Sequence, residues 1–262
     1  MKRQYPASRA AYRVSLSVSL LILSLLFATG CGRKDEDQPL FFAAASLADV
    51  LTEVEQVYEQ QTGKSVLFSF GGSNTLTNQI VTLDAPADGV VLAGQVPMQR
   101  LVDVGKVVPG KLHVVARNSL VIVSSKQTAL ADLQEIASQG GKVAIADPDL
   151  APAGQYAREA LEAAGIWDAL QGRIVPTLDV RAALAAVSSG SVAYAIVYAT
   201  DAMSEPSLKV LLQMDEHLHS PVEYPAAPIN GSKNSEAADD FIQFLRSPGA
   251  APIFQQYGFT SP

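Results

Sequence analysis

Four turns in the sequence join a strand-like run to a helical run through small or hydroxyl-bearing residues. They are Ala44-Ala45-Ser46-Leu47, Phe70-Gly71-Gly72-Ser73-Asn74, Ala151-Pro152-Ala153-Gly154 and Leu178-Asp179-Val180-Arg181. The first backbone N–H groups of a helix lack intrahelical partners and carry partial positive charge. Several such turns at the carboxyl edge of a sheet form an anion site without lysine or arginine. Hydroxyls of Ser46 and Ser73 would add donors, which suits a dianion that only accepts hydrogen bonds.

Each of these residues also has an ordinary structural interpretation. Serine is a common helix N-cap, and Ser46 followed by Asp49 has the spacing of a capping box. Tyr198 ends the apolar run YAIVY, where an aromatic residue is by default half-buried in the core. Ala153 and Val180 offer only backbone groups. Residue types alone therefore leave capping and anion binding both open.

Sequence signatures of enzymes and cofactor sites are missing. The chain has no G-x-S-x-G elbow, no G-x-x-x-x-G-K-[ST] phosphate loop and no G-x-G-x-x-G after a strand. Its histidines are His113, in a strand-like run, and His217 and His219 in the string DEHLH. That string lacks a third ligand group at a suitable spacing, so a solvated polar loop is favoured over a metal site. We expect no cofactor, no direct metal ligand and no enzymatic activity; a hydrolase with a base near Ser46 is the alternative.

Short β-branched or aromatic runs alternate with segments of helical period from Leu40 onward, which is typical of α/β proteins with largely parallel strands. The predicted strands are Leu40–Ala44, Ser65–Phe70, Gly89–Ala93, Leu120–Ser124, Lys142–Ala146, Arg173–Val175, Tyr194–Tyr198 and Lys209–Leu212. Helices are predicted to begin at Leu47 and near Thr75, and to cover Met98–Val104, Leu130–Ala137, Gln155–Ala164, Val180–Val187, Ala237–Leu245 and Pro252–Tyr257. The first of these is the best marked, because Gly63 follows its expected end.

Two breaks in the pattern indicate that the chain changes lobe twice. One lies near Ala116-Arg117-Asn118 and the other around Tyr224-Pro225-Ala226-Ala227-Pro228. The prediction is an outer lobe of residues 40–116 plus 227–262 and an inserted lobe of residues 117–226, each of ordinary domain size. Two crossings between two lobes make a hinge.

The N-terminal segment has the layout of a secretory signal. Basic residues within positions 1–13 precede the uncharged run Val14–Gly30, which ends at Cys31, the only cysteine of the sequence. The string FATGC resembles the lipobox of bacterial lipoproteins, which implies cleavage after Gly30 and a lipid, such as palmitate, on Cys31. We interpret residues 1–30 as a signal peptide and residues 31–39 as a tether. An uncleaved membrane anchor is the alternative, although the run is short for one.

The mature chain would be acidic and free of thiols. Removing residues 1–30, which hold four basic and no acidic residues, changes the formal net charge from −7 to −11. Nucleic-acid binding needs an excess of Lys and Arg, so we expect no nucleic-acid partner. Once Cys31 carries lipid, no thiol remains for a disulfide, a thiolate metal site or a nucleophile.

Longer strings resemble the molybdate-binding proteins of ABC uptake systems. These strings are FFAAASLADVL at 41–51, SFGGSNTLTNQI at 69–80, APAD at 85–88, IADPDLAPAGQYAREALEAAGIWDAL at 145–170, DVRAALAAVSSG at 179–190, AIVYATDA at 195–202, HSPVEYPAAPINGSKN at 219–234 and FLRSPGAAPIFQQYGF at 244–259. The likeness extends from residue 40 to the C-terminus, and the order and spacing of the strings make it specific.

This resemblance implies a type II periplasmic binding protein fold, with two α/β lobes joined by a two-strand hinge. It implies five contacts to an oxyanion: the hydroxyls of Ser46, Ser73 and Tyr198, and the backbone N–H groups of Ala153 and Val180. It further implies a monomer that passes its ligand to the permease and ATPase of an ABC importer, and the lipobox-like string places that monomer outside the cytoplasm on a lipid anchor.

The segment GVVLAGQVPM departs from the family pattern. The family usually continues after APAD with a strand and a Ser-Ala-Asp turn followed by an aromatic residue, whereas Leu92, Gly94 and Pro97 stand at those places here. None of the three is among the five expected contacts, so we expect the change to affect the cleft rim or the contact between lobes.

A site made only of donors should reject a protonated anion, because a ligand O–H would lack an acceptor. Phosphate carries such a proton at neutral pH, whereas molybdate, tungstate and sulfate do not. The resemblance ranks molybdate and tungstate above sulfate. A binding protein for sulfate or another small anion, and an anion sensor without a transport role, remain as alternatives.

Overall fold

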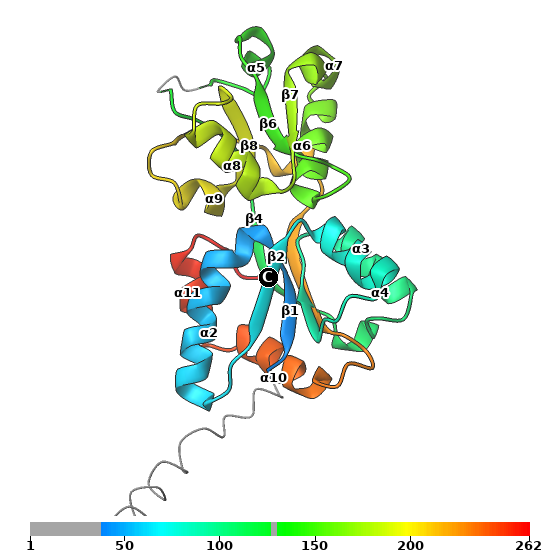
Figure 1. Ribbon diagram of the computed structural model, residues 1–262. Helices are drawn as coiled ribbons and strands as arrows, with labels where there is room; N and C mark the ends of the chain where they lie inside the picture. Colours follow the sequence, from blue (N-terminus) through cyan, green and yellow to red (C-terminus); the bar gives the residue numbers. More distant parts are fainter. Residues whose placement is uncertain (1–37, 127–129) are drawn as a thin grey trace, which may run out of the picture. The chain divides into compact units, whose positions relative to one another are not determined.

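The computed structural model describes residues 38–126 and 130–262. The predicted signal peptide, Cys31 and the tether up to residue 37 lie outside the described residues. Residues 38–262 contain two five-stranded mixed sheets, each flanked by helices, so the predicted α/β class is confirmed (Figure 1). We refer to the two halves as lobe 1 and lobe 2. Within the described ranges, no helix combines the length and the apolarity needed to cross a membrane.

Lobe 1 uses both ends of the described chain. Its strands, in sheet order β2-β1-β3-β10-β4, are β1 (Leu40–Ala44), β2 (Leu67–Gly71), β3 (Gly89–Val91), β4 (His113–Asn118) and β10 (Val222–Pro228). β1 is parallel to β2 and β3, whereas β10 is antiparallel to β3 and β4. Its helices are α2 (Ala48–Thr62), α3 (Ser73–Leu83), α4 (Gln95–Asp103), α10 (Ser235–Leu245) and α11 (Ala251–Gln256), with 3-10 turns η2 (Ala45–Leu47) and η3 (Pro109–Lys111).

Lobe 2 is the segment between the two crossings. Its strands, in sheet order β7-β6-β8-β5-β9, are β5 (Leu120–Ser124), β6 (Val143–Ala146), β7 (Ile174–Thr177), β8 (Tyr194–Tyr198) and β9 (Lys209–Gln213). β6 is parallel to β7 and β8, and β5 is antiparallel to β8 and β9. Its helices are α5 (Glu135–Ser138), α6 (Pro152–Ala163), α7 (Trp167–Leu170), α8 (Val180–Ser188) and α9 (Ala199–Met203), with 3-10 turns η4 (Gln171–Arg173) and η5 (Glu216–Leu218).

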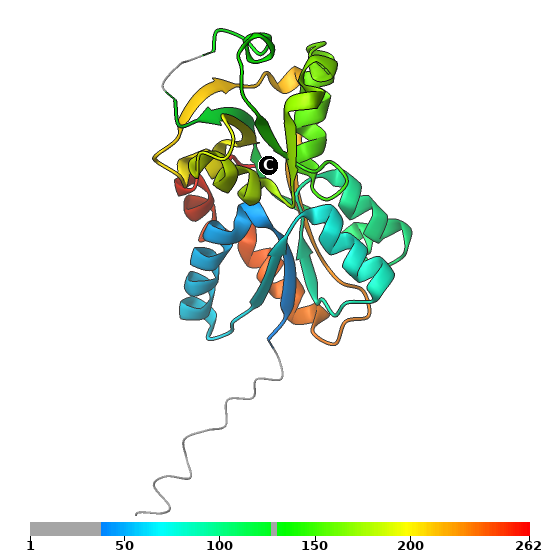
Figure 2. The same ribbon diagram turned by 45° about the horizontal axis from the view of Figure 1, so that its top comes forward.

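Strand β1 shows how sequence alternation builds the core of lobe 1. Successive side chains of a strand point to opposite faces of its sheet. The ring of Phe41 lies 5.1 Å from that of Phe241 on α10, which lies 5.1 Å from Tyr58 on α2. Its neighbour Phe42 belongs instead to a cluster with α3 and α4. Figures 1 and 2 accordingly show α2 on one side of the sheet and α3 and α4 on the other.

The crossings between the lobes are short. β4 in the first sheet ends at Asn118 and β5 in the second begins at Leu120. The chain returns to the first sheet with β10, which begins at Val222, ahead of residue 227 where the sequence placed the return. The polypeptide therefore passes between the sheets at Ser119 and again between β9 and β10.

Side chains and the C-terminal residues brace the lobe 1 side of these crossings. Arg117 of β4 donates from Nε and Nη2 to Oε1 of Glu223 on β10, at 3.0 Å each. The backbones of Arg117 and Thr260 also exchange hydrogen bonds of 2.9 and 3.1 Å. The last residues of the chain are thereby attached to a crossing strand.

Differences from the predicted elements have local causes. Strand β10 is absent from the prediction because Pro225 and Pro228 cannot donate to a ladder, which argues against a central strand. The structure accommodates them with a register shift between Tyr224 and Pro225 where β10 pairs with β4. The predicted helix Leu130–Ala137 is wrong over most of its length, since α5 begins only at Glu135. Helices α7 and α9 were also not predicted.

Candidate anion-binding site

All five residues expected to contact an anion line one small cavity at the junction of the lobes. Ser46 and Ser73 come from lobe 1, and Ala153, Val180 and Tyr198 come from lobe 2. The cavity volume is about 10 Å³. This is about the space that one water molecule needs, so the lobes close tightly around the five residues.

Ser46 does not cap a helix. It lies in the 3-10 turn η2, and the N-cap of α2 is Leu47, without a side-chain hydrogen bond. The capping-box interpretation of Ser46 and Asp49 is therefore wrong. Ser46 is 3% exposed, and its Oγ lies 3.0 Å from the hydroxyl of Tyr224. The turn places this hydroxyl against the cavity directly after β1.

Ser73 also does not act as a cap. It is the first residue of α3, whose N-cap is Gly72. Its Oγ accepts a hydrogen bond of 2.9 Å from the backbone N–H of Ala93, and the side chain is buried. Since the hydroxyl oxygen already accepts, its hydrogen is available to a ligand in the cavity that Ser73 lines.

Two helix N-termini of lobe 2 supply backbone donors. Ala153 is the second residue of α6, after Pro152, and Val180 is the first residue of α8. N–H groups at these positions have no intrahelical acceptor and lie at the positive end of the helix dipole. The carboxylate of Asp179 caps α8 by accepting from the N–H of Ala182 at 2.9 Å, which leaves the N–H of Val180 free of that cap.

Tyr198 ends β8 with its hydroxyl at the cavity. The side chain is 1% exposed, and its hydroxyl has no hydrogen-bond partner among the described residues. Burial raises the pKa of Tyr198 well above its ordinary value, so the phenol stays protonated. A buried hydroxyl without a partner is costly, and a bound acceptor would satisfy it.

The cavity presents neutral donors in place of positive side chains. Within residues 38–126 and 130–262, no Lys or Arg lines it, and Asp179 is its one acidic residue. Hydroxyl and backbone dipoles held in a buried site stabilise a negative charge without reorganisation. The arrangement can bind a small anion that accepts hydrogen bonds from several directions.

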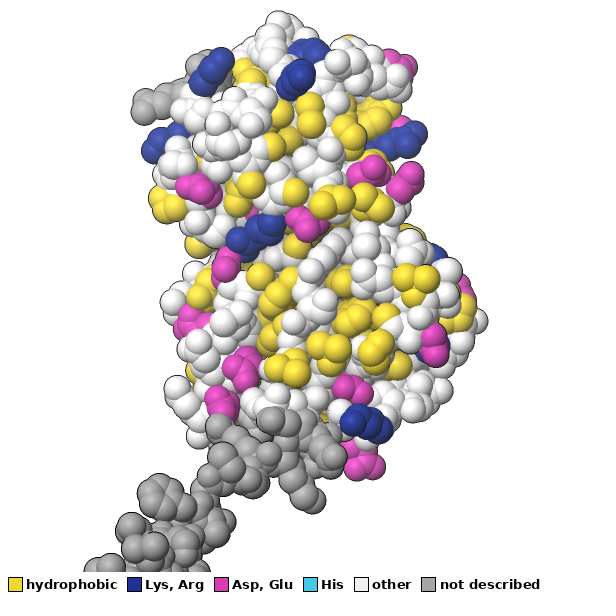
Figure 3. All heavy atoms as spheres, in the orientation of Figure 1, with side chains coloured by type: hydrophobic (Ala, Val, Ile, Leu, Met, Phe, Trp, Pro, Cys, Tyr) yellow, Lys and Arg dark blue, Asp and Glu magenta, His cyan; other side chains and the backbone are white. Residues whose placement is uncertain are grey.

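Direct bonds join the lobes around the cavity. From α3 of lobe 1, the backbone N–H of Thr75 donates to Leu150 O at 3.2 Å, and Asn74 Nδ2 donates to Pro148 O at 3.2 Å. On another side, Arg181 Nη2 of lobe 2 lies 2.7 Å from Asp49 Oδ2 of lobe 1. Figure 3 shows basic and acidic side chains next to one another at this junction. The lobes are therefore in contact, with the cavity between them.

The buried carboxylate of Asp201 supports both Arg181 and Tyr198. Its Oδ1 lies 2.7 Å from Arg181 Nε, and its Oδ2 accepts from the backbone N–H of Tyr198 at 3.3 Å. Burial raises the pKa of Asp201 from 3.8 to about 6, against the opposing effects of Arg181 and the Tyr198 N–H. The carboxyl group of Asp201 thus binds its proton more tightly in the folded protein than in the unfolded chain.

Replacing Asp201 should remove one component of the pH dependence of stability. A raised carboxyl pKa contributes stability that is full below 3.8 and is lost as the pH rises to about 6. Relative to Asp201→Asn, which keeps an oxygen for the Tyr198 N–H, the wild type should lose about 3 kcal/mol of unfolding free energy across this window. Chemical denaturation of both proteins over that pH range measures the difference. A constant difference would contradict the assignment.

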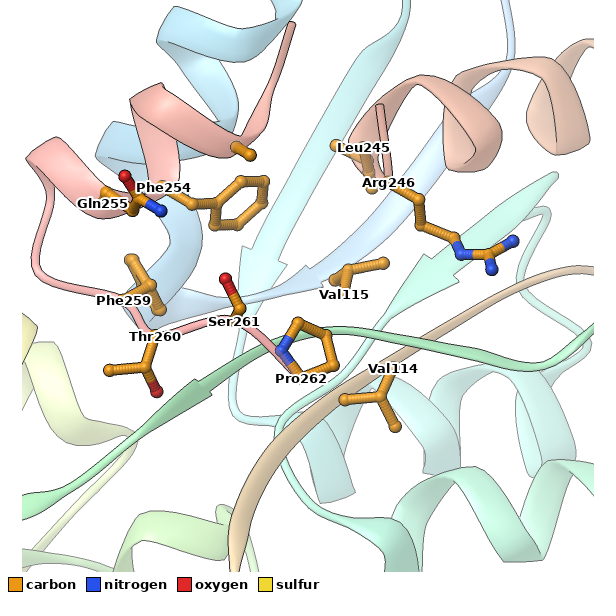
Figure 4. A pocket seen from close by; sticks show the side chains of 11 residues that line it. Val114, Val115, Leu245, Arg246, Phe254, Gln255, Phe259, Thr260, Ser261 and Pro262 are labelled. Carbon is orange, nitrogen blue, oxygen red and sulfur yellow. The ribbon is translucent and has the colours of Figure 1, made fainter. Parts of the chain in front are cut away.

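Neither a metal centre nor the cavity inside lobe 1 matches this arrangement of donors. In the described ranges, no group of three His, Cys, Asp or Glu side chains is placed to hold a metal ion. A cavity of about 260 Å³ lies within lobe 1, between β4, α10, α11 and the C-terminal residues. Figure 4 shows that it is bounded largely by apolar side chains such as Val115 and Phe254, with the Arg246 guanidinium extending away from the aromatic rings. It offers no convergence of helix N-termini.

The unusual segment after β3 takes part in the lobe contact. Ala93 lines the cavity and holds Ser73. Gly94, with φ 81°, faces Pro152 and the hydroxyl of Tyr156 in lobe 2, where a Cβ would lie 2.8 Å from that oxygen. Leu92 is fully buried and donates its N–H to Pro225 O at 2.9 Å. The departure from the family pattern thus lies beside the five predicted residues.

Sequence reasoning missed the residues that support the predicted ones. Asn118, Tyr224 and Asp201 bond to groups of the site or to one another, yet none carries a motif. The sequence also did not indicate that Gly72 lies against the backbone of lobe 2. Only their positions inside the quoted family strings, or beside a predicted crossing, marked these residues at all.

Comparisons with known proteins agree with this geometry. A family model for bacterial extracellular solute-binding proteins matches residues 40–260. The molybdate-binding protein ModA of Escherichia coli (strain K12) is 36% identical over 233 residues, which cover 86% of this chain and 90% of that protein. A Bacillus subtilis (strain 168) protein with the provisional name ABC transporter substrate-binding lipoprotein YvgL is 31% identical over 225 residues, which cover 84% of this chain and 85% of that protein.

A solved structure shows the same architecture. The periplasmic molybdate-binding protein of Azotobacter vinelandii matches with a TM-score of 0.77 at 24% identity, covering 86% of this chain and 100% of that chain. A likeness at this identity concerns the fold. The predicted type II periplasmic binding protein fold is thereby confirmed.

Proposed function

The chain belongs to the bacterial extracellular solute-binding proteins, and from that premise we propose that it captures molybdate, and also tungstate, for an ABC importer. The observation that carries the proposal is the cavity of neutral donors formed by Ser46, Ser73, Ala153, Val180 and Tyr198. Relatives that align over most of the chain are named for molybdate binding, which supports the choice of ligand.

The donors explain why a dianion without protons is the expected ligand. Its oxygens accept from three hydroxyls and from the N-termini of α6 and α8, and no ligand hydrogen is left unpaired. A monohydrogen anion would place its O–H among donors only. The donors therefore select proton-free oxyanions, and the molybdate-binding relatives support ranking molybdate and tungstate above sulfate.

Capture would couple to lobe closure. Ser46 and Ser73 lie on one lobe, and the other three contacts lie on the second lobe. Only a closed protein can make both sets of contacts, so the ligand favours closure by differential binding. The bonds from Thr75 to Leu150 and from Arg181 to Asp49 also stabilise the closed arrangement of the lobes.

As a member of an extracellular family, the protein works outside the cytoplasm with a permease and an ATPase. We propose in addition that a lipid on Cys31 holds it to the membrane, that it acts as a monomer, and that it catalyses no reaction. The lipobox-like string FATGC and the lipoprotein name of the Bacillus subtilis relative support the anchor. Mass spectrometry of the mature N-terminus tests it.

Calorimetric titration tests the ligand assignment. The wild type is expected to prefer molybdate and tungstate over sulfate, and to bind phosphate least. Ser73→Ala should weaken molybdate binding by about tenfold to a hundredfold, because a hydrogen bond to a charged group contributes about 1.5–3 kcal/mol. Ser188→Ala, at the far end of α8 with an exposed hydroxyl, is the control and should match the wild type. A preference for sulfate or phosphate, or full affinity in Ser73→Ala, would overturn the proposal.

A further inference from the structure

The hydroxyl of Ser46 ends a short series of hydrogen bonds that starts at a lobe crossing. Asn118 Nδ2 lies 3.2 Å from the hydroxyl of Tyr224, which lies 3.0 Å from Ser46 Oγ. Asn118 is the last residue of β4, and Tyr224 lies in the neighbouring strand β10. Neither residue lines the cavity, and their hydrogen bonds reach it through Ser46.

The orientation of the Asn118 amide is fixed by its neighbour. The backbone N–H of Ser119 can only donate, and it lies 2.9 Å from Asn118 Oδ1. Nδ2 must therefore face the other two partners, the Tyr224 hydroxyl and Thr200 Oγ1, the latter at 2.8 Å. Because an amide nitrogen has donors and no acceptor, the Tyr224 oxygen accepts from Asn118.

The orientation of Asn118 also determines which hydroxyl donates in the hydrogen bond between Tyr224 and Ser46. Tyr224 is fully buried, and among the described residues Ser46 is the one remaining hydrogen-bond partner of its hydroxyl. If Ser46 donated to Tyr224, the phenolic hydrogen would be buried without an acceptor, which is the costlier arrangement. Tyr224 therefore donates to Ser46, and Ser46 turns its own hydrogen toward the cavity.

We propose that Tyr224 and Asn118 are positioning residues that set specificity: they hold Ser46 as a donor and so restrict the cavity to anions without a proton. This inference rests on the proposed function, and it names the two side chains that make the site discriminate against protonated anions. Ser73 is held in the same sense by the backbone N–H of Ala93, which no side-chain substitution removes. Tyr224 is thus the point at which donor direction can be changed by substitution.

Tyr224→Phe tests the proposal with little change in packing. The ring of Tyr224 lies 5.4 Å from Phe259 and 6.0 Å from Tyr198, and phenylalanine keeps both contacts. Without the phenolic hydrogen, Ser46 can rotate and offer a lone pair to a ligand O–H. The probes are molybdate and arsenate, tetrahedral dianions of similar size, of which arsenate carries one proton at mildly alkaline pH. By calorimetry, with arsenate in competition where it binds weakly, the preference for molybdate over arsenate should narrow about tenfold.

A matched control separates donor direction from the general loss of a buried hydroxyl. Tyr194, at the other end of β8 from Tyr198, donates from its buried hydroxyl to Gln139 Oε1 at 2.7 Å. Tyr194→Phe should leave the molybdate-to-arsenate ratio at the wild-type value. In a Ser46→Ala background, Tyr224→Phe should no longer change the molybdate-to-arsenate ratio, whereas the effect of a purely structural role would persist there.

Asn118→Asp provides a second variant should Tyr224→Phe fail to fold. A carboxylate oxygen in place of Nδ2 accepts the phenolic hydrogen of Tyr224, so the Tyr224 oxygen accepts from Ser46 and the molybdate-to-arsenate ratio should narrow in the same direction by severalfold. An unchanged ratio in the folded variants would overturn the positioning role while leaving molybdate binding intact. Absence of molybdate binding in the wild type would instead overturn the proposed function.

Discussion

Gly72→Ala is expected to lower molybdate affinity by about a hundredfold while leaving the ligand-free protein stably folded. A Cβ on Gly72 would lie 2.5 Å from Leu150 O and 3.1 Å from Leu178 O, both backbone atoms of lobe 2. Backbone atoms cannot move aside as a flexible side chain does, so the added methyl group holds the lobes apart. Only the closed form makes all five ligand contacts, so a variant that closes less readily binds molybdate more weakly.

The backbone conformation of Gly72 makes this variant informative. Its φ of −63° and ψ of 130° are accessible to alanine, so the substitution adds no strain in the open form. Calorimetry and the rise of the melting temperature on adding molybdate measure the effect. Gly110→Ala in lobe 1, where a Cβ would meet nothing within 4 Å, is the control. Wild-type affinity in Gly72→Ala would show that closure does not bring these atoms together.

Gly154→Ala should destabilise lobe 2 itself. A Cβ there would overlap Ala146 O and would lie 2.8 Å from the backbone nitrogen of Pro148. These atoms belong to the end of β6 and the turn that leads into α6, so relief requires moving the helix from its strand. Alanine's better helix propensity offsets about 1 kcal/mol, but the clash is expected to exceed it and to cost about 3 kcal/mol or more.

Denaturant unfolding of the ligand-free protein measures this loss. Gly172→Ala, also in lobe 2 and with nothing within 4 Å of its Cβ, should unfold as the wild type does. The displaced start of α6 should also weaken ligand binding, because the Ala153 N–H moves with it. Equal stability of Gly154→Ala and the wild type would mean that α6 packs on β6 less closely than the structure shows.

Local patterns predicted the elements whose stability is local. The strands at Leu40–Ala44, Leu120–Ser124 and Tyr194–Tyr198 have the predicted bounds, because buried apolar runs flanked by turn residues mark them directly. Gly63 follows the end of α2 as expected, since a left-handed C-cap favours glycine. These features depend on residues that are neighbours in the sequence.

Features that depend on distant partners were harder to predict. β10 contains two prolines and exists because β3 and β4 pair with it on both sides. Ser46 had the spacing of a capping box, but Asp49 pairs with Arg181 of the other lobe. Such choices are made by tertiary contacts, which override local propensity.

The candidate site also contains features that local sequence predicts and features that depend on distant partners. Strand-to-helix turns indicated where donors could converge, and the structure brings those five positions to one cavity. The donor direction at Ser46 depends on Asn118 and Tyr224, which lie 72 and 178 positions away in the sequence. No periodicity or motif encodes a hydrogen-bond polarity over that separation.

The pairing of Thr260 with Arg117 has a practical consequence for measurement. The backbone of Thr260 is held to the strand about which the lobes would turn, and Ser261 and Pro262 follow it at the surface. A fluorophore joined after Pro262 would therefore sit beside the pivot and sense its rotation as a change in surroundings. A fluorophore at this position could therefore report the binding of dissolved oxyanion. A bulky purification tag at the same position would instead hinder the rotation of the lobes.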